Sequence, residues 1–529
     1  MIIAANVSSP FSSLQPIVRL VNAFSEPYNN AIATARTCYC TRVITSNDVQ
    51  QDETARAQRD IIARSTYTAG HHTTLQHAAF QFIIENVSRQ FVWSFLHAHP
   101  FYNSEQVSQR YVKVQPDRLL IPQLPAREAE FYQQTAAAQM LCYRELTEIL
   151  IEPTAKAYFD IFQARQKQRE QYLPAIRKKA QEVARYALPV ATFTQLYHTV
   201  SGLTLHRYHR LSRMLDVPNE TRIVINAMID AVNEHDPLFF SYIEDPLELE
   251  QTHEYALLSS LGITTPNSNA HLFCKSFDAD LGEFSSRLLD YQNHGEKLLA
   301  QAVRTTIGLN ATQLSDSDAI AWVLSPKQNP YLGGALNLAS IGKVTRSLMH
   351  PHYTFLKKLS HAADSQDQRH RMTPGSRPIL STQYRSGTPD VILPTLIANF
   401  DTAHDRFMQT MQQTWQAIDK LLDAGVTPEF ALYLLPNAFP IRFIESGDLA
   451  AWQHKWSTRL CYNAQDEIWR ATVDEVKQIR EQHPTIGQYL GPPCATRQQT
   501  NVKPYCPEGS RYCGVKVWQQ NLNDYNRVI

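Results

Sequence analysis

One short stretch of polar residues has the types and spacing needed to bind a small anion. Glu105, Ser108, Arg110 and Tyr111 follow one another closely, and Arg185 lies further along the chain. Arginine offers a planar fork of N–H donors that neutralises a phosphate in a fixed geometry, and backbone amides near Ser108 could complete an anion-binding nest. Each residue also has an ordinary interpretation, as a surface or helix-capping arginine or as a turn hydroxyl. Only their place together in one motif favours the binding interpretation.

Two histidine pairs could also do chemistry. They are His97-Ala98-His99 in the first half of the chain and His350-Pro351-His352 in the second. Alternate residues of a strand share a face, so either pair could bind zinc. A spacing of two without a third ligand is a weak signal for a metal, however. An altered ligand-binding segment is the preferred interpretation of both pairs.

Three cysteines lie close together in the last part of the chain. They are Cys494, Cys506 and Cys513, among glycine and proline residues that predict a loop. They could hold zinc or an iron–sulfur cluster, with Cys461 or His483 as the fourth ligand. Their spacings match no common metal-binding template, so three reduced thiols around turns remain an equal alternative.

Composition restricts the classes of protein to which the chain can belong. It has 529 residues, 43% of them hydrophobic and 19% charged, and a net charge of zero. These values are typical of a globular protein with more than one domain, and the absence of a cationic excess argues against a nucleic-acid or membrane surface. We expect no signal peptide and no membrane span. The eight dispersed cysteines predict a reducing, cytoplasmic location.

The elements that must position these residues are mostly helices. Helical spacing of apolar residues predicts helices over 126–150 and 218–233, and β-like runs occupy 78–85 and 110–114. The turn-rich segment 261–268 is a candidate linker.

The chain also repeats itself. Residues 182–189 and 429–436 both predict a helix ended by Leu-Pro, and the Val-Ser-Arg-Gln stretch at 87–90 recurs in degraded form at 344–347. We therefore predict two repeated units, residues 1–258 and 259–490, and a cysteine-containing tail, residues 491–529.

The motifs resemble those of the flavin-dependent thymidylate synthases (ThyX). That family carries Arg-His-Arg-x-x-Ser-x-Asn-Glu-x-Ser-x-Arg-Tyr. The stretch from Glu105 to Tyr111 is similar to its second half, with one extra residue before Ser108, and residues 70–77 resemble an upstream family element. Arg459, followed by Ala-Gln-Asp-Glu-Ile at 464–468, resembles a downstream one. The two histidine pairs stand where the family's Arg-His-Arg triplet is expected.

The resemblance implies a fold, an activity and a set of roles. The fold would be α+β, with each unit a twisted antiparallel sheet flanked by helices. Glu105, Ser108 and Arg459 would be catalytic. Substrate would also be bound by Arg110, Tyr111, Arg185 and His350. FAD would contact a set of residues at one end of the first unit: Cys38, His71, Thr73, His77, His97 and His99.

In that family each nucleotide site is built across a subunit boundary, which implies a division of labour here. The first unit would give Glu105, Ser108, Arg110 and Arg185, and the second would give His350 and Arg459. The reciprocal combination has lost most of its functional residues, and we expect it to be scaffold: Asp364, Asp367, Arg369 and Leu432 with His97 and Ser212. Two chains would then form a homodimer that resembles the family's tetramer.

Three functions are compatible with these features. The first is reductive methylation of dUMP at C5, with methylenetetrahydrofolate, reduced FAD and NADPH. The second is another C5 modification of a pyrimidine nucleotide, because the triplet is altered. The third is a noncatalytic nucleotide-binding or scaffold protein that has lost flavin.

Overall fold

Two four-stranded antiparallel sheets organise the chain. The computed structural model describes residues 9–97, 101–213, 215–336, 338–525, 527 and 529. The first sheet has the strand order β1-β2-β4-β3 and the second β5-β6-β8-β7, so the central pair of each is formed by strands far apart in sequence. The strands are β1 (Ile17–Ala23), β2 (Ala79–Ser88), β3 (Tyr102–Gln106), β4 (Phe193–Ser201), β5 (Ser286–Tyr291), β6 (His352–Ser360), β7 (Gly375–Ser376) and β8 (Pro440–Asp448).

Of two strands predicted from the sequence, one is present and the other is not. In β2, Phe80, Phe82 and Ile84 alternate with more exposed residues and are buried, as the period of two in a strand requires. The mixed α+β class is confirmed. The predicted strand over 110–114 is wrong: the amides of Tyr111 and Val112 both donate to the Ser108 carbonyl, which closes a turn.

Helices surround the sheets. In the first half they are α1 (Pro27–Thr37), α2 (Glu53–Thr68), α3 (Arg89–His97), α4 (Ala126–Ile149), α5 (Ile151–Ile161), α6 (Arg169–Ala184), α7 (Gly202–Arg210), α8 (Pro218–His235) and α9 (His253–Ser260). In the second half they are α10 (Ala270–Leu281), α11 (Gly295–Ile307), α12 (Asp316–Leu324), α13 (His361–Asp367), α14 (Leu380–Gln383), α15 (Thr395–Ala398), α16 (Asp401–Asp423), α17 (Pro428–Leu432), α18 (Leu449–Arg459), α19 (Asp466–Gln482), α20 (Pro484–Gly487) and α21 (Pro493–Gln499).

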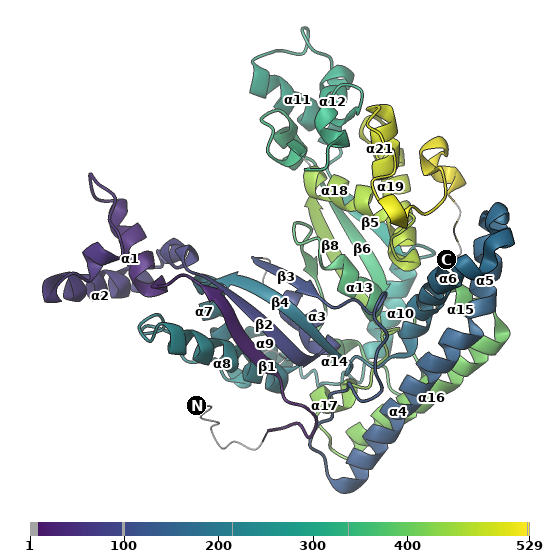
Figure 1. The fold of residues 1–529 in the computed structure, drawn as a ribbon, viewed down its shortest axis with the longest axis horizontal. Coiled ribbons are helices and arrows are strands. Elements are labelled where there is room, and N and C mark those ends of the chain that lie inside the picture. The colour runs from purple at the N-terminus through teal and green to yellow at the C-terminus, as the bar shows by residue number, and fades with distance from the viewer. Residues whose placement is uncertain (1–8, 98–100, 214, 337, 526, 528) are drawn as a thin grey trace.

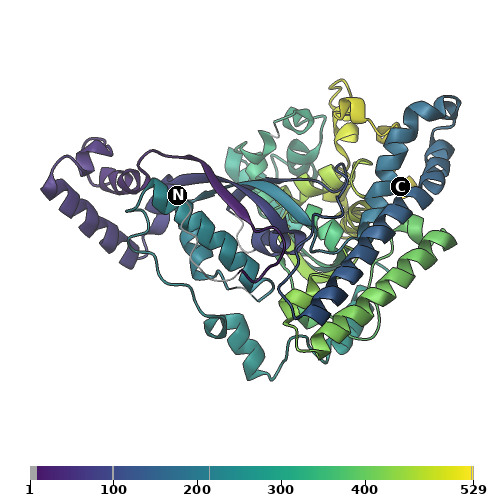
Figure 2. The ribbon, with the colours of Figure 1, turned by 60° about the horizontal axis from the view of Figure 1, so that its bottom comes forward.

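Two predicted helices are confirmed, and one of them joins the halves. The helix expected over 126–150 is α4, and that expected over 218–233 is α8. The long helices α4 and α16 lie side by side along one edge of the molecule (Figures 1 and 2). Helix α6 packs on α4 and carries Glu182 toward the second half. Across the described residues, no helix is both long enough and apolar enough to span a bilayer.

Backbone hydrogen bonds between the two Leu-Pro segments come in matched pairs. The amide of Val190 donates to the carbonyl of Leu435, and the amide of Asn437 donates to that of Leu188, both at 2.8 Å. Pro189 and Pro436 also face each other in a bridge. The segments that the sequence marks as similar therefore pair with each other about an approximate two-fold axis.

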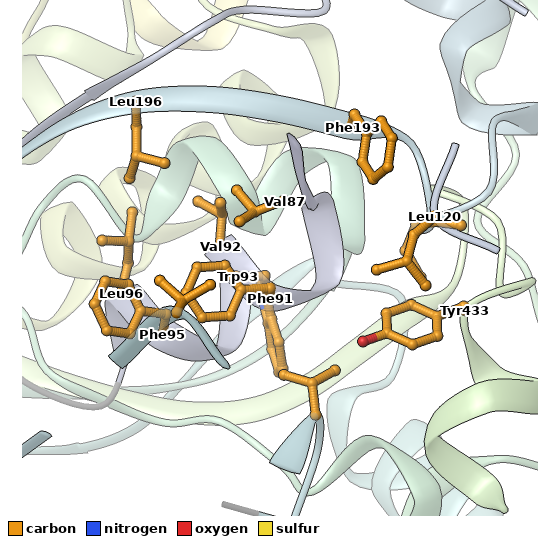
Figure 3. Close-up of a cluster of buried hydrophobic side chains, with 14 of the residues drawn as sticks. Val87, Phe91, Val92, Trp93, Phe95, Leu96, Leu120, Phe193, Leu196 and Tyr433 are labelled. Carbon is orange, nitrogen blue, oxygen red and sulfur yellow. The ribbon is translucent and has the colours of Figure 1, made fainter. Parts of the chain in front are cut away.

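A single buried cluster extends across both halves. Figure 3 shows Tyr433, from the second half, close to Leu120 and Phe91 of the first. The loop expected at 261–268 does lie between α9 and α10. The domain boundaries after residues 258 and 490 stay predictions.

Candidate functional site

Arg110 is buried where the two halves meet. Its Nε and Nη2 atoms donate to the Glu182 carboxylate at 2.9 and 3.3 Å. Nη2 also donates to the backbone carbonyl of Asn463 at 2.8 Å. The Ser108 hydroxyl accepts from the Arg110 amide at 3.3 Å, so Ser108 shapes the turn that presents this arginine. Tyr111 is half exposed, with its ring 5.4 Å from the Arg110 guanidinium carbon.

Arg459 reaches the same place from the last turn of α18. The surrounding donors assign the Gln366 amide with its oxygen toward the two arginines, and in that orientation it accepts from both Arg110 and Arg459 at 3.1 Å. Arg459 also donates through Nε to His370 Nε2 at 2.9 Å. Burial lowers the pKa of Arg459 to about 10, opposed by Asp367 and aided by Arg110 and Arg369. Guanidinium groups held this close without a matching number of carboxylates attract an anion.

Arg185 is the third buried arginine of this region. It lies just after α6 and donates to the Gln465 side chain at 2.9 Å, while its Nε has no partner among the described residues. Burial disfavours ionisation of the neighbouring Glu182, but Lys179, Arg110 and Arg185 outweigh it and lower the Glu182 pKa to about 2. The unpaired Nε is therefore a buried donor available to a ligand.

A second set of contacts runs along the edge strand β3. Arg369 forms an ion pair with Glu105 at 2.5 Å, and the side chains are 48% and 77% exposed. Arg371 donates to the Asn103 side chain at 3.3 Å. His370 lies between these two arginines in sequence and accepts from Arg459. The sequence Arg-His-Arg at 369–371 thus spans from Glu105 to the buried arginines.

A cavity of about 730 Å³ opens beside this segment. Its lining includes Phe101 and Asn103 from the first half and Arg369, His370 and His454 from the second. The size falls in the range of sites for cofactors and small molecules. Because its lining contains both arginine and aromatic side chains, the cavity suits a planar, anionic ligand.

Two matched serine–glutamate pairs fix how the halves correspond. Ser88 donates through its amide and hydroxyl to Glu220 at 2.7 and 2.6 Å, and Ser360 does the same to Glu467 at 2.5 and 2.6 Å. His97 lies nine residues after Ser88, and Arg369 nine after Ser360. The counterpart of His97-Ala98-His99 is therefore Arg369-His370-Arg371.

This correspondence corrects the assignment of the second triplet. His350 and His352 are exposed, ahead of and at the start of β6, and His350 does not join the arginines. Arg369, assigned to the degenerate combination, instead contacts Glu105. The sequence Arg-His-Arg at 369–371 could have identified this counterpart. It was missed because His350-Pro351-His352 resembles His97-Ala98-His99 more closely in sequence.

Among the described residues, none of those expected to contact FAD lines this cavity. Cys38, His71, Thr73 and His77 are exposed, at the end of the first half that carries α1. His97 ends helix α3 and does not lie on a strand, so the shared-face argument for a zinc-binding pair is wrong there. His99 lies outside the described residues.

The environment of His97 is buried. Its Nε2 lies 3.6 Å from Asp364, and burial lowers its pKa to about 3, aided by Arg377 and opposed by Asp364. A neutral histidine packed in this way resembles a core residue more than a ligand contact.

The residues of the reciprocal combination are buried, apart from the exposed Arg369 and the partly buried His97, and its two carboxylates pair with neighbouring side chains. Asp364 accepts from Trp93 at 2.7 Å and from Arg377 at 2.9 Å. Asp367 accepts from Lys455 at 2.7 Å. Leu432 and Ser212 are also buried. Carboxylates that are already paired and sealed from water are poor ligand contacts. The scaffold interpretation of this combination stays a prediction.

The tail cysteines gather around one cavity. Cys494, Cys506 and Cys513 line a space of about 190 Å³ together with Cys461. His483, the other suggested ligand, instead contacts the Tyr353 hydroxyl at 2.8 Å. Within the part of the chain that the structure describes, no group of three or more His, Cys, Asp or Glu side chains is arranged to hold a metal ion.

Comparisons with known proteins agree with the motifs. The family model described as "Thymidylate synthase complementing protein" matches residues 19–238 and again 287–485. The flavin-dependent thymidylate synthase of Geobacter sulfurreducens is 31% identical over 172 residues, covering 32% of this chain and 70% of the relative. That of Nitratidesulfovibrio vulgaris is 30% identical over 185 residues, covering 33% and 72%.

A solved structure gives a weaker likeness. The UMP/dUMP methylase PolB from Streptomyces cacaoi, bound with 5-Br dUMP, shares 18% identity and a TM-score of 0.30, covering 42% of this chain and 93% of that one. The family match rests on the sequence comparisons, in which one model fits two successive segments. The chain therefore belongs to the thymidylate synthase complementing protein family, whose relatives here are flavin-dependent thymidylate synthases.

Proposed function

We propose that the protein methylates dUMP at C5, using methylenetetrahydrofolate as the one-carbon donor and reduced FAD, regenerated by NADPH, as the reductant. The observation that carries this proposal is the meeting of Arg110 and Arg185 with Arg369 and Arg459. The first two belong to the first half of the chain and the last two to the second. The proposed reaction is the one for which the relatives are named. The arginines provide a site for its anionic substrate.

The nucleotide would occupy the buried arginine group. A 5′-phosphate carries nearly two negative charges at neutral pH, which the Arg110 and Arg185 guanidinium groups would neutralise. The Gln366 oxygen between Arg110 and Arg459 occupies a position that a ligand oxygen could take. Arg459 would then stabilise negative charge that develops on the uracil carbonyls when C5 attacks the one-carbon unit.

The residues beside the cavity fit a flavin. Arg369 and Arg371 offer guanidinium forks for a diphosphate, and His370 is held neutral by burial and by Arg459, which lower its pKa. When bound, reduced flavin supplies the hydride. Glu105 would hold Arg369 in place through their ion pair.

The site implies an architecture. We infer that the chain is a tandem duplication of one synthase-like unit, in which one cross-unit combination of residues was kept and the other became scaffold. The exposed Cys38, His71, Thr73 and His77 would contact FAD only if a second chain brought its cavity to them. A homodimer that imitates a tetramer would do so. All eight cysteines are free of disulfides, which is typical of a cytoplasmic enzyme.

A purified sample tests the proposal in two steps. Flavin absorbance, present as isolated or after reconstitution with FAD, is expected. Protein that cannot be reconstituted favours a noncatalytic nucleotide-binding role. Tritium release from C5-labelled dUMP, dependent on methylenetetrahydrofolate and NADPH, is the second expectation. Flavin binding with tritium release that does not require folate would identify a different C5 modification.

A further inference from the structure

Half of the cysteines of this chain meet at one place. Cys461 lies in the segment between α18 and α19, Cys494 in α21, and Cys506 and Cys513 in the loops beyond it. All four line the cavity of about 190 Å³. The remaining cysteines lie elsewhere, either exposed near α1 or buried in helices α4 and α10.

The surroundings of the four thiols are partly enclosed. Each side chain is partly buried, and all four face the same space. A thiophilic cation would bind them as thiolates, because a coordinated thiol is deprotonated outright.

Few apolar side chains attach the tail to the rest of the molecule. Helix α21 has no buried residue, and the tail contributes few side chains to the hydrophobic core, chiefly Val517 and Leu522. Segments too small to build a core of their own usually hold their shape through disulfides or metals. The four cysteines form no disulfide in this structure.

We infer that Cys461, Cys494, Cys506 and Cys513 ligate an iron–sulfur cluster. Four thiolates without histidine are the ligand set of [4Fe–4S] clusters and of structural zinc. The cavity between the thiols favours the cluster, since a single zinc ion with bonds of about 2.3 Å needs its ligands gathered at one point. No described side chains are gathered in that way. Binding would release one proton per thiol as the thiolates form.

The cluster would brace the arginine site. Cys461 follows Arg459 by two residues and precedes Asn463 by two, and the Asn463 carbonyl accepts from Arg110. The Asn463 side chain donates to the Arg511 carbonyl of the tail at 2.7 Å. A cluster that joins Cys461 to the tail would fix this segment from its outer side. The inference does not depend on the reaction that the site performs.

Metal and sulfide analysis of the full chain, purified without oxygen, tests the inference. We expect about four iron and about four acid-labile sulfide per chain, as in a [4Fe–4S] cluster. Zinc alone, near one per chain, would overturn the cluster. Neither iron nor zinc after anaerobic reconstitution with iron and sulfide would overturn the site altogether.

Variants assign the ligands. Cys506→Ser and Cys513→Ser should lose most of the iron, whereas the exposed Cys38→Ser and Cys40→Ser should keep it. Iron retained in both Cys506→Ser and Cys513→Ser would overturn the assignment. If those variants are insoluble, Mössbauer spectroscopy of the wild-type protein decides, because it reports the cluster even beside a bound flavin. A spectrum without cluster iron would contradict the inference.

Discussion

Arg110 and Arg459, from opposite halves of the chain, donate to the same oxygen of Gln366 at 3.1 Å each. Neither half contains this arrangement alone, because the position of Arg459 is Ser212 in the first half and that of Arg185 is Leu432 in the second. The two losses are complementary. If one site draws residues from both halves, each half can lose the functional residues that the other half retains.

Removing either arginine should weaken nucleotide binding. Arg110→Ala and Arg459→Ala each delete charge-assisted hydrogen bonds worth about 1.5–3 kcal/mol, which corresponds to about a ten- to hundredfold higher Kd for dUMP. Titration calorimetry measures this directly. Arg169→Ala is a matched control, since Arg169 pairs with Glu152 on the surface. Normal affinity for dUMP in either Arg110→Ala or Arg459→Ala would contradict a nucleotide site shared by the two halves.

Because Arg369-His370-Arg371 is the counterpart of the first triplet, substitutions of Arg369 and His350 should affect ligand affinity differently. Arg369→Ala should raise the Kd for FAD about tenfold or more, because it removes a guanidinium fork from the cavity wall. The melting temperature should hardly move, since the Arg369–Glu105 pair is exposed. His350→Ala, at the position first assigned to substrate binding, should leave the affinities for both dUMP and FAD unchanged. The reverse pattern would restore His350 as the ligand contact.

The sequence predicted the parts of this molecule that depend on local pattern. Helices α4 and α8 have apolar spacing that continues over several turns, and strand β2 alternates over most of its length, so all three were recognisable. Glu105, Ser108, Arg110 and Arg185 stood out because they occupy positions of the family's motif. The division of the site between halves also followed from comparing which positions each half had kept.

Other features depend on contacts between distant residues and left no local signal. The stretch 110–114 alternates like a strand, but Arg110 is drawn to Glu182 and the backbone turns at Ser108. The correspondence of Arg369 with His97 becomes visible only through the Ser88–Glu220 and Ser360–Glu467 bonds. Sequence similarity near His350 therefore identified the counterpart of His97 less reliably than the equivalent hydrogen bonds in the two halves.

The buried charge cluster of the second half should be sensitive to the loss of one cation. Lys455 donates to Asp367 and Glu445 at 2.7 Å, and all three side chains are inaccessible to solvent. Lys455→Met leaves two buried carboxylates short of a partner, which costs about 3–5 kcal/mol of unfolding free energy. Chemical denaturation measures this. Arg177→Ala, at the exposed pair with Glu148, should cost about 1 kcal/mol or less. A similarly small loss in Lys455→Met would mean that water enters the cluster.

Two buried glutamates, Glu220 in the first turn of α8 and Glu429 in α17, should make stability depend on pH. Burial raises the pKa of Glu220 to about 7 and that of Glu429 to about 7, although hydrogen bonds from Ser88 and Asn219 oppose the shifts. Between the ordinary pKa of 4.5 and about 7, the folded chain holds more protons than the unfolded chain. Stability from these groups is therefore complete below pH 4.5 and declines as the pH rises toward 7.

Glu220→Gln isolates that contribution, because glutamine does not titrate. Relative to wild type, the variant should gain about 1–3 kcal/mol of unfolding free energy between about pH 5 and pH 8, since it avoids ionising a buried carboxylate. Denaturant titrations at the two pH values give the difference. Glu130→Gln, at an exposed position of α4, should show no such trend. Wild-type and Glu220→Gln stabilities that change in parallel with pH would show that Glu220 ionises as readily in the folded chain as in the unfolded one.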